Sequence, residues 1–242
     1  MKLIRHGEPG KETPGLQLSD GTRLGSPVAR PSKIICVGLN YRDHAAETNS
    51  PLPDEPFLFS KASTALCGPY DELIIPRNSQ NTDWEVELAL VVGKRSSYIT
   101  EESAPGHIAG YALVCDYSER AFQKNRGGQF VKGKSADSFA PLGPFLATRD
   151  ELPDIDHLNL WLKVNGELRQ DGNTSELIFK VPFLLSYISQ FMTLLPGDDI
   201  STGTPSGVGA GMKPPQFLKP GDQIELGIDG LGSSSQTAVA AQ

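Results

Sequence analysis

Hydrophobic and polar positions alternate along residues 83–92, DWEVELALVV, and this pattern predicts a strand with one face in the core. Residues two apart in a strand lie on the same face. The face expected in the core carries Trp84, Val86, Leu88 and Leu90. The other face begins with Glu85 and Glu87 but continues with alanine and valine, so it is not a plain solvent face. The apolar run at residues 108–115 predicts a second strand.

Three carboxylates belong to these two strands. Glu85 and Glu87 are neighbours on one face of the first strand, and Asp116 directly follows the second. Two carboxylates side by side repel each other, so a nearby positive charge must offset them. No thiol or imidazole lies close to them on the first strand, and three carboxylates favour a hard ion, Mg²⁺ or Mn²⁺. The alternative interpretation is an exposed Glu-x-Glu pair on an edge strand.

The rest of the chain is typical of short strands joined by turns, because it contains 25 Gly and 19 Pro residues. The clearest hairpin spans residues 159–170 around an Asn165-Gly166 turn. The best helix is predicted over residues 183–195. Its apolar stripe consists of Leu184, Ile188, Phe191 and Leu195. We therefore expect an α+β fold that is mainly β, with few short helices.

Two parts of the chain are expected. Residues 1–32 are predicted to form a small N-terminal β appendage and a linker, with two short strands around an Asp20-Gly21 turn. Residues 33–242 are predicted to form the catalytic domain, and this length is enough for one large core.

Charge and composition exclude several classes of function. The formal net charge is −7 and no Lys/Arg run offers a phosphate-binding stripe, so we expect no nucleic-acid partner. No apolar run approaches the roughly 18 residues that a membrane helix needs. The start of the chain lacks the apolar core of a signal peptide. The cysteines are widely spaced, and two of them lie in apolar runs, so we expect buried thiols in a reducing cytoplasm.

A His-x-x-Glu pair follows the apolar strand predicted at residues 33–39. A short helix is expected there, capped by Asn40 or Asp43, and His44 and Glu47 would share one of its faces. A carboxylate that holds a histidine fixes the tautomer and stabilises the imidazolium, as a general base requires. The alternative is an ordinary solvated polar helix.

Further polar residues could serve the same site. Lys61 follows two phenylalanines on one strand face, and sequence alone favours its extension to solvent. Arg120 and Gln123 are expected to face the same way as Asp116, on a helical turn. Lys134 lies in a predicted loop, where it is either an ordinary surface lysine or a cation held charged by the carboxylates. The glycine-rich loop ISTGTPSGVGAGM offers backbone amides for an anion, with Thr204 as the one hydroxyl placed to help.

The order of these signals resembles the fumarylacetoacetate hydrolase family over roughly residues 30–239. The motifs that carry the resemblance are GLNYRDHAAE, LFSKASTALCGP, DWEVELALVVG, GYALVCDYSERAFQ, GKSADSFAPLGP, LWLKVNGELRQ, ISTGTPSGVG and PGDQIELGIDGLG. The closing stretch is most similar to a bacterial branch often labelled ureidoglycolate lyase, which includes 2,4-didehydro-3-deoxy-L-rhamnonate hydrolases. That branch usually has a longer segment where SDGTR here runs directly into LGSPVARP.

The resemblance implies a mixed β-roll, a homodimer and a Mg²⁺ or Mn²⁺ cofactor. It implies a metal held by Glu85, Glu87 and Asp116, a catalytic pair of His44 and Glu47, and substrate contacts from Lys61, Arg120, Gln123, Lys134 and Thr204.

The activity expected from these residues is hydrolysis of the C–C bond of a 2,4-diketo acid, which releases pyruvate and a second acid. The metal would bind the 2-oxo acid, His44 would activate water, and Lys134 would support the oxyanion or protonate the leaving enolate. Two alternatives use the same metal site, namely decarboxylation of oxaloacetate and isomerisation of an oxo-enoic acid. A third is a β protein that only binds an anion or a metal.

Overall fold

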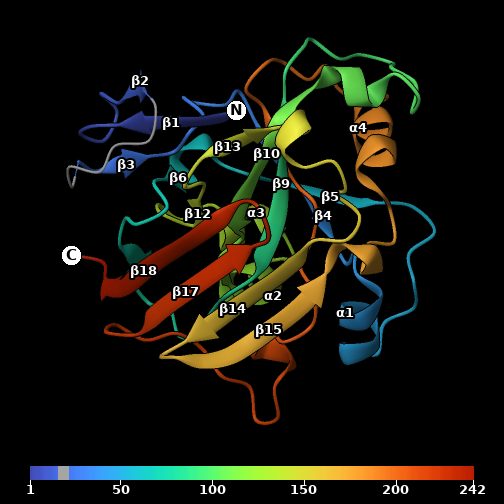
Figure 1. Ribbon diagram of the computed structural model, residues 1–242. Helices are drawn as coiled ribbons and strands as arrows, with labels where there is room; N and C mark the ends of the chain where they lie inside the picture. Colours follow the sequence, from blue (N-terminus) through green and yellow to red (C-terminus); the bar gives the residue numbers. More distant parts are fainter. Residues whose placement is uncertain (16–21) are drawn as a thin grey trace.

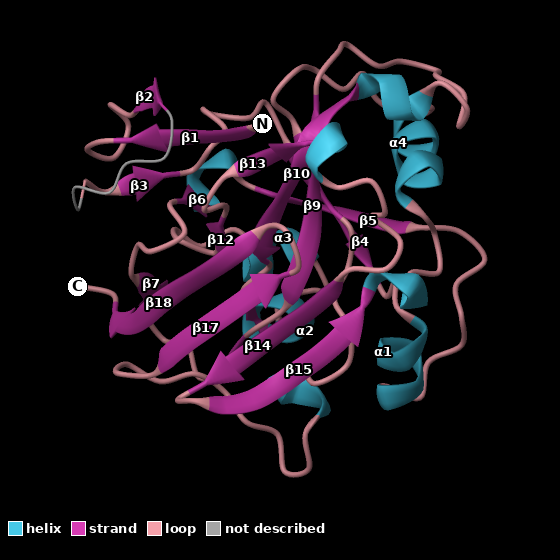
Figure 2. Cartoon of the chain, in the orientation of Figure 1, coloured by secondary structure: helices cyan, strands magenta, loops and turns pink. Residues whose placement is uncertain are grey.

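The computed structural model describes residues 1–15 and 22–242, and strands dominate it (Figures 1 and 2). The Asp20-Gly21 turn expected from the sequence lies outside the described residues. The prediction of a mainly β fold with mixed sheets and few short helices is confirmed.

The larger sheet has nine strands, paired in the order β2-β1-β13-β10-β9-β16-β4-β5, and β3 also pairs with β1. Its strands are β1 (Lys2–His6), β2 (Thr13–Gly15), β3 (Leu24–Gly25), β4 (Ile34–Gly38), β5 (Phe57–Lys61), β9 (Val86–Val92), β10 (Ile108–Cys115), β13 (Leu146–Thr148) and β16 (Asp199–Ser201). Strand β16 runs parallel to β4 and antiparallel to β9, so it joins the two halves of this sheet.

The second sheet has five strands in the order β15-β14-β17-β18-β7. They are β7 (Leu73–Ile75), β14 (Asn159–Val164), β15 (Glu167–Asn173), β17 (Gln223–Ile228) and β18 (Gly232–Ala240). In Figure 1 this sheet lies across β9 and β10. Leu160 and Leu226 from it belong to the same buried cluster as Leu88 and Leu113, so the main core lies between the two sheets.

Short elements complete the fold. The remaining strands form two small pairs: β8 (Thr82–Asp83) with β11 (Ser118–Glu119), and β6 (Leu66–Cys67) with β12 (Ala140–Pro141). The α-helices are α1 (Arg42–Glu47), α2 (Arg120–Asn125), α3 (Phe130–Lys134) and α4 (Val181–Ser189). The 3₁₀ turns are Ser63–Ala65, Ala104–His107, Arg149–Glu151, Thr174–Glu176 and Gly209–Gly211.

The strand predicted at residues 83–92 is divided between two partners. Its start belongs to β8, which pairs with β11, and its end is β9, which pairs with β10. The side chain of Asp83 accepts a hydrogen bond from the backbone N–H of Trp84, at 2.9 Å, where the chain passes from one pairing to the other. The strand predicted at residues 108–115 matches β10. The predicted hairpin is also confirmed, since Asn165 and Gly166 both have the positive φ angles of a type I′ turn, 52° and 79°.

The helix predicted at residues 183–195 is shorter than expected. Helix α4 ends at Ser189, and the placement of Phe191 and Leu195 in the core was wrong, because these side chains are 63% and 40% exposed. The backbone N–H of Phe191 donates to the carbonyl of Ile188, three residues back, in a tightened final turn. The chain then leaves the helix to form a β-bridge between Leu194 and Ser96.

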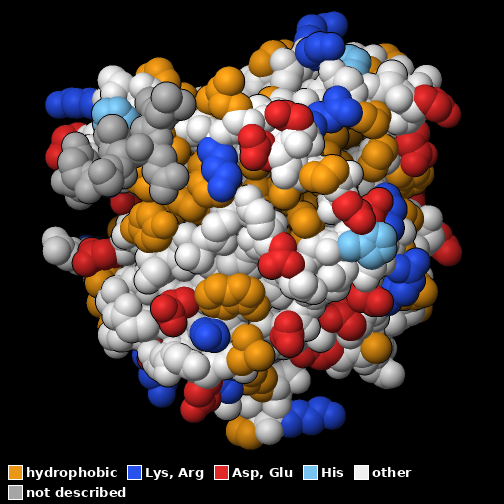
Figure 3. All heavy atoms as spheres, in the orientation of Figure 1, with side chains coloured by type: hydrophobic (Ala, Val, Ile, Leu, Met, Phe, Trp, Pro, Cys, Tyr) orange, Lys and Arg blue, Asp and Glu red, His pale blue; other side chains and the backbone are white. Residues whose placement is uncertain are grey.

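The N-terminal strands continue the larger sheet. Strand β1 pairs with β2 along one edge and with β3 and β13 along the other, where Leu3 is opposite Leu146. Two predicted buried thiols, Cys36 and Cys115, are indeed buried, and all three cysteines are free. No described helix has the length and apolar character needed to cross a membrane. Acidic and basic side chains are interspersed over the face in Figure 3.

Candidate metal centre and active site

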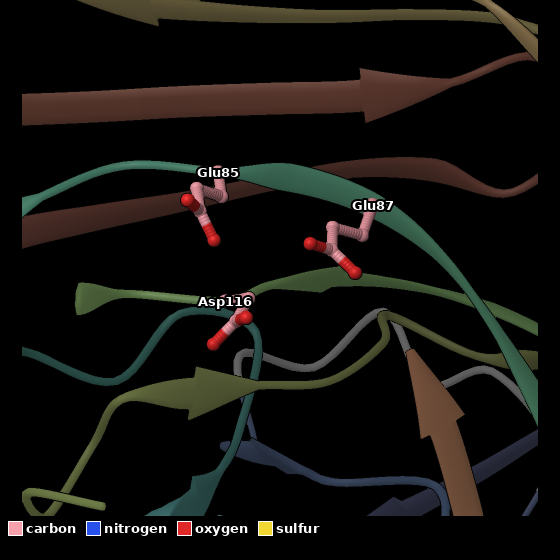
Figure 4. A group of neighbouring side chains, drawn as sticks. All are labelled: Glu85, Glu87 and Asp116. Atoms are coloured by element: carbon pink, nitrogen blue, oxygen red, sulfur yellow. The ribbon is translucent and has the colours of Figure 1, made fainter. Parts of the chain in front are cut away.

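The pairing of β9 with β10 brings the three predicted carboxylates together. Glu87 is opposite Val114 in this pairing, and the backbone N–H of Asp116 donates to the carbonyl of Glu85 at 2.8 Å. Figure 4 shows the three carboxylates turned toward one shared space. One oxygen from each lies within 4.8 Å of the others, and all three residues are buried. The alternative of an exposed Glu-x-Glu pair on an edge strand is therefore wrong, because β9 lies inside the sheet.

Three cations surround the triad formed by Glu85, Glu87 and Asp116. Lys134 Nζ donates to Glu85 Oε2 and to Asp116 Oδ2, each at 2.5 Å. Lys61 Nζ contacts Asp116 Oδ1 and donates to the carbonyl of Tyr117 at 3.0 Å. Arg120 donates to Glu85 Oε1 at 2.6 Å and to Asp83 Oδ2 at 2.8 Å. The site is thus a dense network of buried ion pairs.

These ion pairs decide the protonation states. Burial alone would raise the pKa of Glu85, but Arg120 and Lys134 outweigh it and hold that pKa far below its usual range. Burial would lower the pKa of Lys134, but Asp116 and Glu85 raise it above its ordinary value. At neutral pH, Glu85 is therefore an anion and Lys134 is a cation.

Glu87 differs from the other two members of the triad. Burial, followed by the charges of Asp116 and Glu85, raises its pKa well above the ordinary value. Ser201 Oγ and the backbone N–H of Gly203 donate to its Oε2, at 2.5 and 2.8 Å. Among the described residues, no hydrogen bond to its Oε1 is found. Glu87 thus has a carboxyl group that is held in place through Oε2, while Oε1 is not hydrogen-bonded to any described residue.

The residues present fit a hard divalent cation. Four buried carboxyl groups, those of the triad and Asp83, share three cationic side chains among the described residues, so the site has an excess of negative charge when Glu87 is ionised, as it would be on binding a cation. Each carboxylate oxygen has a second lone pair beyond the hydrogen bond it accepts. Oxygen donors of this kind suit Mg²⁺ and Mn²⁺. Glu85, Glu87 and Asp116 are the residues that would hold the ion.

Both lysines are deeply buried, which corrects two interpretations made from the sequence. The expectation that Lys61 extends to solvent was wrong, since the residue is 4% exposed. The reading of Lys134 as an ordinary surface lysine was also wrong, and it ends helix α3 instead of lying in a loop. Gly133 explains how α3 reaches the site: a Cβ there would come within 2.6 Å of the Glu119 carbonyl, so only glycine lets α3 approach α2 so closely.

Helix α1 presents the predicted His–Glu pair. His44 Nδ1 lies 2.9 Å from Glu47 Oε2, and the side chains are 13% and 17% exposed, which does not match a solvated helix. Glu47 Oε1 also accepts a hydrogen bond from the N–H of Gly207 at 2.8 Å. A Cβ at Gly211 would lie 2.6 Å from the Glu47 carboxyl carbon, so a larger residue there would displace the Glu47 side chain. With Nδ1 held by the carboxylate, His44 keeps Nε2 free to accept a proton.

The predicted helix cap was wrong. Tyr41 occupies the N-cap position and makes no side-chain cap. Asn40 is buried and fixes neighbouring segments, because its Nδ2 donates to the carbonyl of Thr202 at 2.7 Å and its Oδ1 accepts from Phe179 N–H. Asp43 Oδ2 accepts from the backbone N–H and the hydroxyl of Ser206, at 3.1 and 3.0 Å. Together with Glu47, Asp43 docks α1 onto the glycine-rich loop.

A cavity of about 390 Å³ joins these groups. Seven of the predicted site residues line it: His44, Glu85, Glu87, Arg120, Gln123, Lys134 and Thr204. Glu47 contacts His44 and Asp116 contacts Lys134, while Lys61 contacts Asp116 in turn. A larger cavity of about 530 Å³, between the N-terminal strands and residues 63–71, contains none of the predicted site residues. The chemistry therefore points to the smaller one.

The hydroxyl of Thr204 has two protein partners. It donates to the carbonyl of Val86 at 2.9 Å and accepts from Gln170 Nε2 at 2.8 Å. The hydroxyl proton is therefore already donated to a protein acceptor. Thr204 lines the cavity but does not have this proton available for a ligand. Gln170, which the sequence did not single out, also accepts from the N–H of Val86 at 2.9 Å. It fixes the start of β9 from the second sheet.

Asp83 is another residue that sequence reasoning missed. It is completely buried, and it accepts from Arg120, Trp84 N–H and the backbone N–H groups of Gly209 and Ala210. It therefore ties α2 to the glycine-rich loop on the opposite side of the cavity. The sequence offered one indication that Asp83 belongs to the site, namely its position two residues before Glu85.

The fold and site define a mainly β protein with a buried, highly charged cavity sized for a small molecule. The chain belongs to the fumarylacetoacetate hydrolase family, because residues 33–239 match the family model described as Fumarylacetoacetate (FAA) hydrolase C-terminal. Members of this family are enzymes, hydrolases and isomerases among them.

Known relatives support this assignment. The chain is 44% identical to a Burkholderia multivorans protein whose name proposes a hydrolase without a substrate; their alignment covers 100% of both chains. This alignment spans 282 positions and the chain has 242 residues, so the alignment contains gaps. The structure of 5-carboxymethyl-2-hydroxymuconate delta-isomerase from Mycobacterium smegmatis is 32% identical, with a TM-score of 0.86 and 100% of both chains covered.

A third similar protein carries ligands. It is maleylpyruvate hydrolase from Sphingobium sp. SYK-6, in complex with manganese(II) ion and pyruvate. The identity is 32% and the TM-score is 0.78, over 96% of this chain and 78% of that one.

Proposed function

We propose that this protein is a Mg²⁺- or Mn²⁺-dependent hydrolase that cleaves the C–C bond of a 2,4-diketo acid to pyruvate and a second acid. The observation that carries the proposal is one cavity lined by both a buried acidic triad and a histidine held by a glutamate. A similar protein that acts on maleylpyruvate, and whose structure contains Mn²⁺ and pyruvate, supports the same substrate class.

The triad and its lysines would receive the 2-oxo acid end of the substrate. When bound, the divalent cation supplies coordination for the carboxylate and 2-oxo oxygens and stabilises the negative charge that develops there. Lys134 and Arg120 add fixed positive charge at the same end, and both side chains are largely shielded from solvent. These cations need no reorganisation during the reaction, because the carboxylates already hold them in place.

His44 would activate the water. Its Nε2 accepts a proton from the water molecule while the water oxygen attacks the distal C4 carbonyl, and Glu47 stabilises the resulting imidazolium. A positioned base of this kind typically contributes about 10²–10⁴-fold to the rate. The bond between C3 and C4 then breaks.

Lys134 would assist the leaving group. Its ammonium group stabilises the negative charge on the departing three-carbon fragment, and C3 takes up a proton to give pyruvate. The hydroxyl from water remains on C4, so the other product is a carboxylic acid. The atoms of one water molecule are thus shared between the two products.

Isotope labelling tests this assignment directly. Purified protein with Mn²⁺ is incubated with 2,4-diketo acids in H₂¹⁸O, and the products are analysed by mass spectrometry. Hydrolysis predicts pyruvate together with one ¹⁸O atom in the carboxylate of the second acid. Absence of a product from every 2,4-diketo acid tested would instead favour a protein that only binds an anion or metal.

Isomerisation is the second candidate, because one of the similar structures is named a delta-isomerase. It needs the same stabilised enolate but no attacking water, as does decarboxylation of oxaloacetate. The His44–Glu47 pair favours hydrolysis, since it supplies the base for water. Conversion of an oxo-enoic acid without C–C cleavage in the same assay would favour the isomerase.

We also propose that the protein is a homodimer. Analytical ultracentrifugation should then give twice the chain mass of 26.1 kDa. A sedimenting species with the mass of one chain would exclude this state.

A further inference from the structure

Lys124 is a cation of the cavity for which the described residues provide no anionic partner. It lies in the last turn of helix α2, lines the cavity and is exposed. Among residues 1–15 and 22–242, no hydrogen bond or ion pair to it is found. By contrast, Lys61, Arg120 and Lys134 are each paired with buried carboxylates. The positive charge of Lys124 is therefore available to a ligand.

Helix α2 places Lys124 farther from the triad than Arg120. The helix starts at Arg120, which contacts Glu85, and residues four apart lie on the same helix face. Lys124 is thus one turn farther along that face, about 6 Å at the rise of an α-helix. The outer position is also the more exposed one, because the Arg120 side chain is 11% exposed whereas Lys124 faces solvent. Helix α2 therefore leads from the triad to the mouth of the cavity.

Helix α3 also leads from the triad toward the cavity mouth, but its C-terminal end is the one at the triad. It ends at Lys134 on the triad and begins one turn away at Phe130, which also lines the cavity. The rings of Phe130 and Phe59 lie 5.4 Å apart, and Lys134 Nζ lies 4.8 Å from the Phe59 ring centre. Phe59 and Phe130 thus form an apolar wall that extends from the charged end of the cavity toward Lys124.

The opposite wall adds hydroxyl groups. Thr48 and Ser50 follow helix α1 and line the same cavity. The Thr48 hydroxyl donates to the carbonyl of His44 at 2.9 Å and lies 3.1 Å from the hydroxyl of Ser50. In this contact the Ser50 oxygen is the acceptor, and no acceptor for its own proton is found among the described residues, so that proton can turn toward a ligand.

We propose that Lys124 makes this enzyme selective for diketo acids that carry a second carboxylate at the end distal to the pyruvoyl group. The inference rests on the proposed function for the position of the pyruvoyl end at the triad. The carbon chain of the substrate would lie along Phe59 and Phe130, and the distal carboxylate would pair with Lys124 and accept a hydrogen bond from Ser50. A single lysine at the cavity mouth suits one carboxylate, and Lys124 is a specificity residue that takes no part in bond cleavage.

The test compares two substrates of matched length, one with a distal carboxylate and one with a distal methyl group. Wild-type protein should have a higher kcat/KM for the dicarboxylate, and Lys124→Gln should reduce that preference roughly 3- to 10-fold, as expected for a partly exposed ion pair. Cleavage of the methyl-ended substrate should change little. The matched control is Lys132→Gln, an exposed lysine that donates to the carbonyl of Arg126 and does not line this cavity.

Binding separates this inference from the proposed function. Calorimetry with Mn²⁺ present compares 2-oxoadipate with 2-oxohexanoate, which lacks the distal carboxylate, in wild type and Lys124→Gln. Preferential binding of 2-oxoadipate that depends on Lys124 supports the inference even if no diketo acid is hydrolysed. Absence of hydrolysis would reject only the proposed hydrolase activity. The inference would be overturned if Lys124→Gln lowered the affinity for both ligands and kcat/KM for both substrates equally, or lowered none of them. Either result would leave the proposed hydrolase activity intact.

Discussion

Two groups of buried carboxylates lie in the same nine-stranded sheet, and their surroundings are opposite. In the triad on β9 and β10, Glu85 and Asp116 have their oxygens paired with lysine or arginine. On β16, the strand next to β9, Asp199 is completely buried, and neither of its carboxyl oxygens has a hydrogen-bond partner among the described residues. Burial and the charge of neighbouring Asp198 raise the pKa of Asp199 to about 7.

The comparison shows that burial alone does not determine whether a carboxyl group is charged. Desolvation acts on both regions, but the triad receives cations from β5, α2 and α3, whereas no described residue places a cation on Asp199. A buried carboxylate that is kept charged in this way can serve chemistry. A buried carboxyl group without a partner is expected to remain protonated below its raised pKa.

Removing one charge from the triad should have the largest effect. Glu85→Gln is expected to abolish Mg²⁺ and Mn²⁺ dependence together with activity, because it removes a charged ligand and unbalances Arg120 and Lys134. Titration with Mn²⁺ and a pyruvate-release assay measure the two losses. The control is Glu225→Gln, an exposed glutamate on β17. Full activity of Glu85→Gln after chelation of divalent ions would show that the triad does not hold the metal.

The unpartnered carboxyl group should affect stability instead of catalysis. The folded-state pKa of Asp199 lies above its ordinary value of 3.8, so folding favours the protonated form between these values. Stability of the wild type should therefore fall as pH rises from about 4 to 7, by up to about 4 kcal/mol. The asparagine side chain of Asp199→Asn cannot ionise, so the stability of this variant relative to wild type should increase as pH rises over this range.

Chemical denaturation of both proteins at pH 5 and pH 8 measures this difference. Asp199→Asn should be the more stable protein at pH 8, and its advantage should shrink at pH 5. An advantage of the same size at both pH values would mean that Asp199 has its ordinary pKa in the folded protein.

Breaking the link between α2 and the glycine-rich loop should have a smaller effect on stability. Asp83→Asn weakens the pairing with Arg120, which keeps Glu85 as its partner, so we expect a loss of about 3 kcal/mol at most. Asp137→Asn, at an exposed position, is the control. Urea denaturation provides the measurement, and a loss no larger than that of the control would show that Asp83 does not hold the loop.

Much of the sheet could be predicted from the sequence because strand periodicity is local. The run at residues 108–115 matches β10, and the Asn165-Gly166 turn matches the observed hairpin. The triad was also accessible, since an antiparallel pair with Asp116 at its end must place that residue near Glu85. Local signals of this kind need no knowledge of the rest of the chain.

The rest depended on long-range contacts. Lys61 was expected to extend to solvent, because nothing near it in the sequence shows that Asp116 will lie beside it. Phe191 was expected in the core because the apolar pattern continues beyond the point where α4 ends. Asp83 and Gln170 were missed because their partners lie on other elements, the glycine-rich loop and the start of β9. Helix and strand patterns do not report such pairings.

The central claim, a hydrolase that uses a histidine to activate water, is tested most directly by kcat/KM in wild type and His44→Ala for two substrates. These are a 2,4-diketo acid and oxaloacetate, whose decarboxylation needs no activated water. Our account predicts that His44→Ala lowers cleavage of the diketo acid by about 10²–10⁴-fold and affects oxaloacetate much less. A wild type that decarboxylates oxaloacetate but turns over no diketo acid would contradict it.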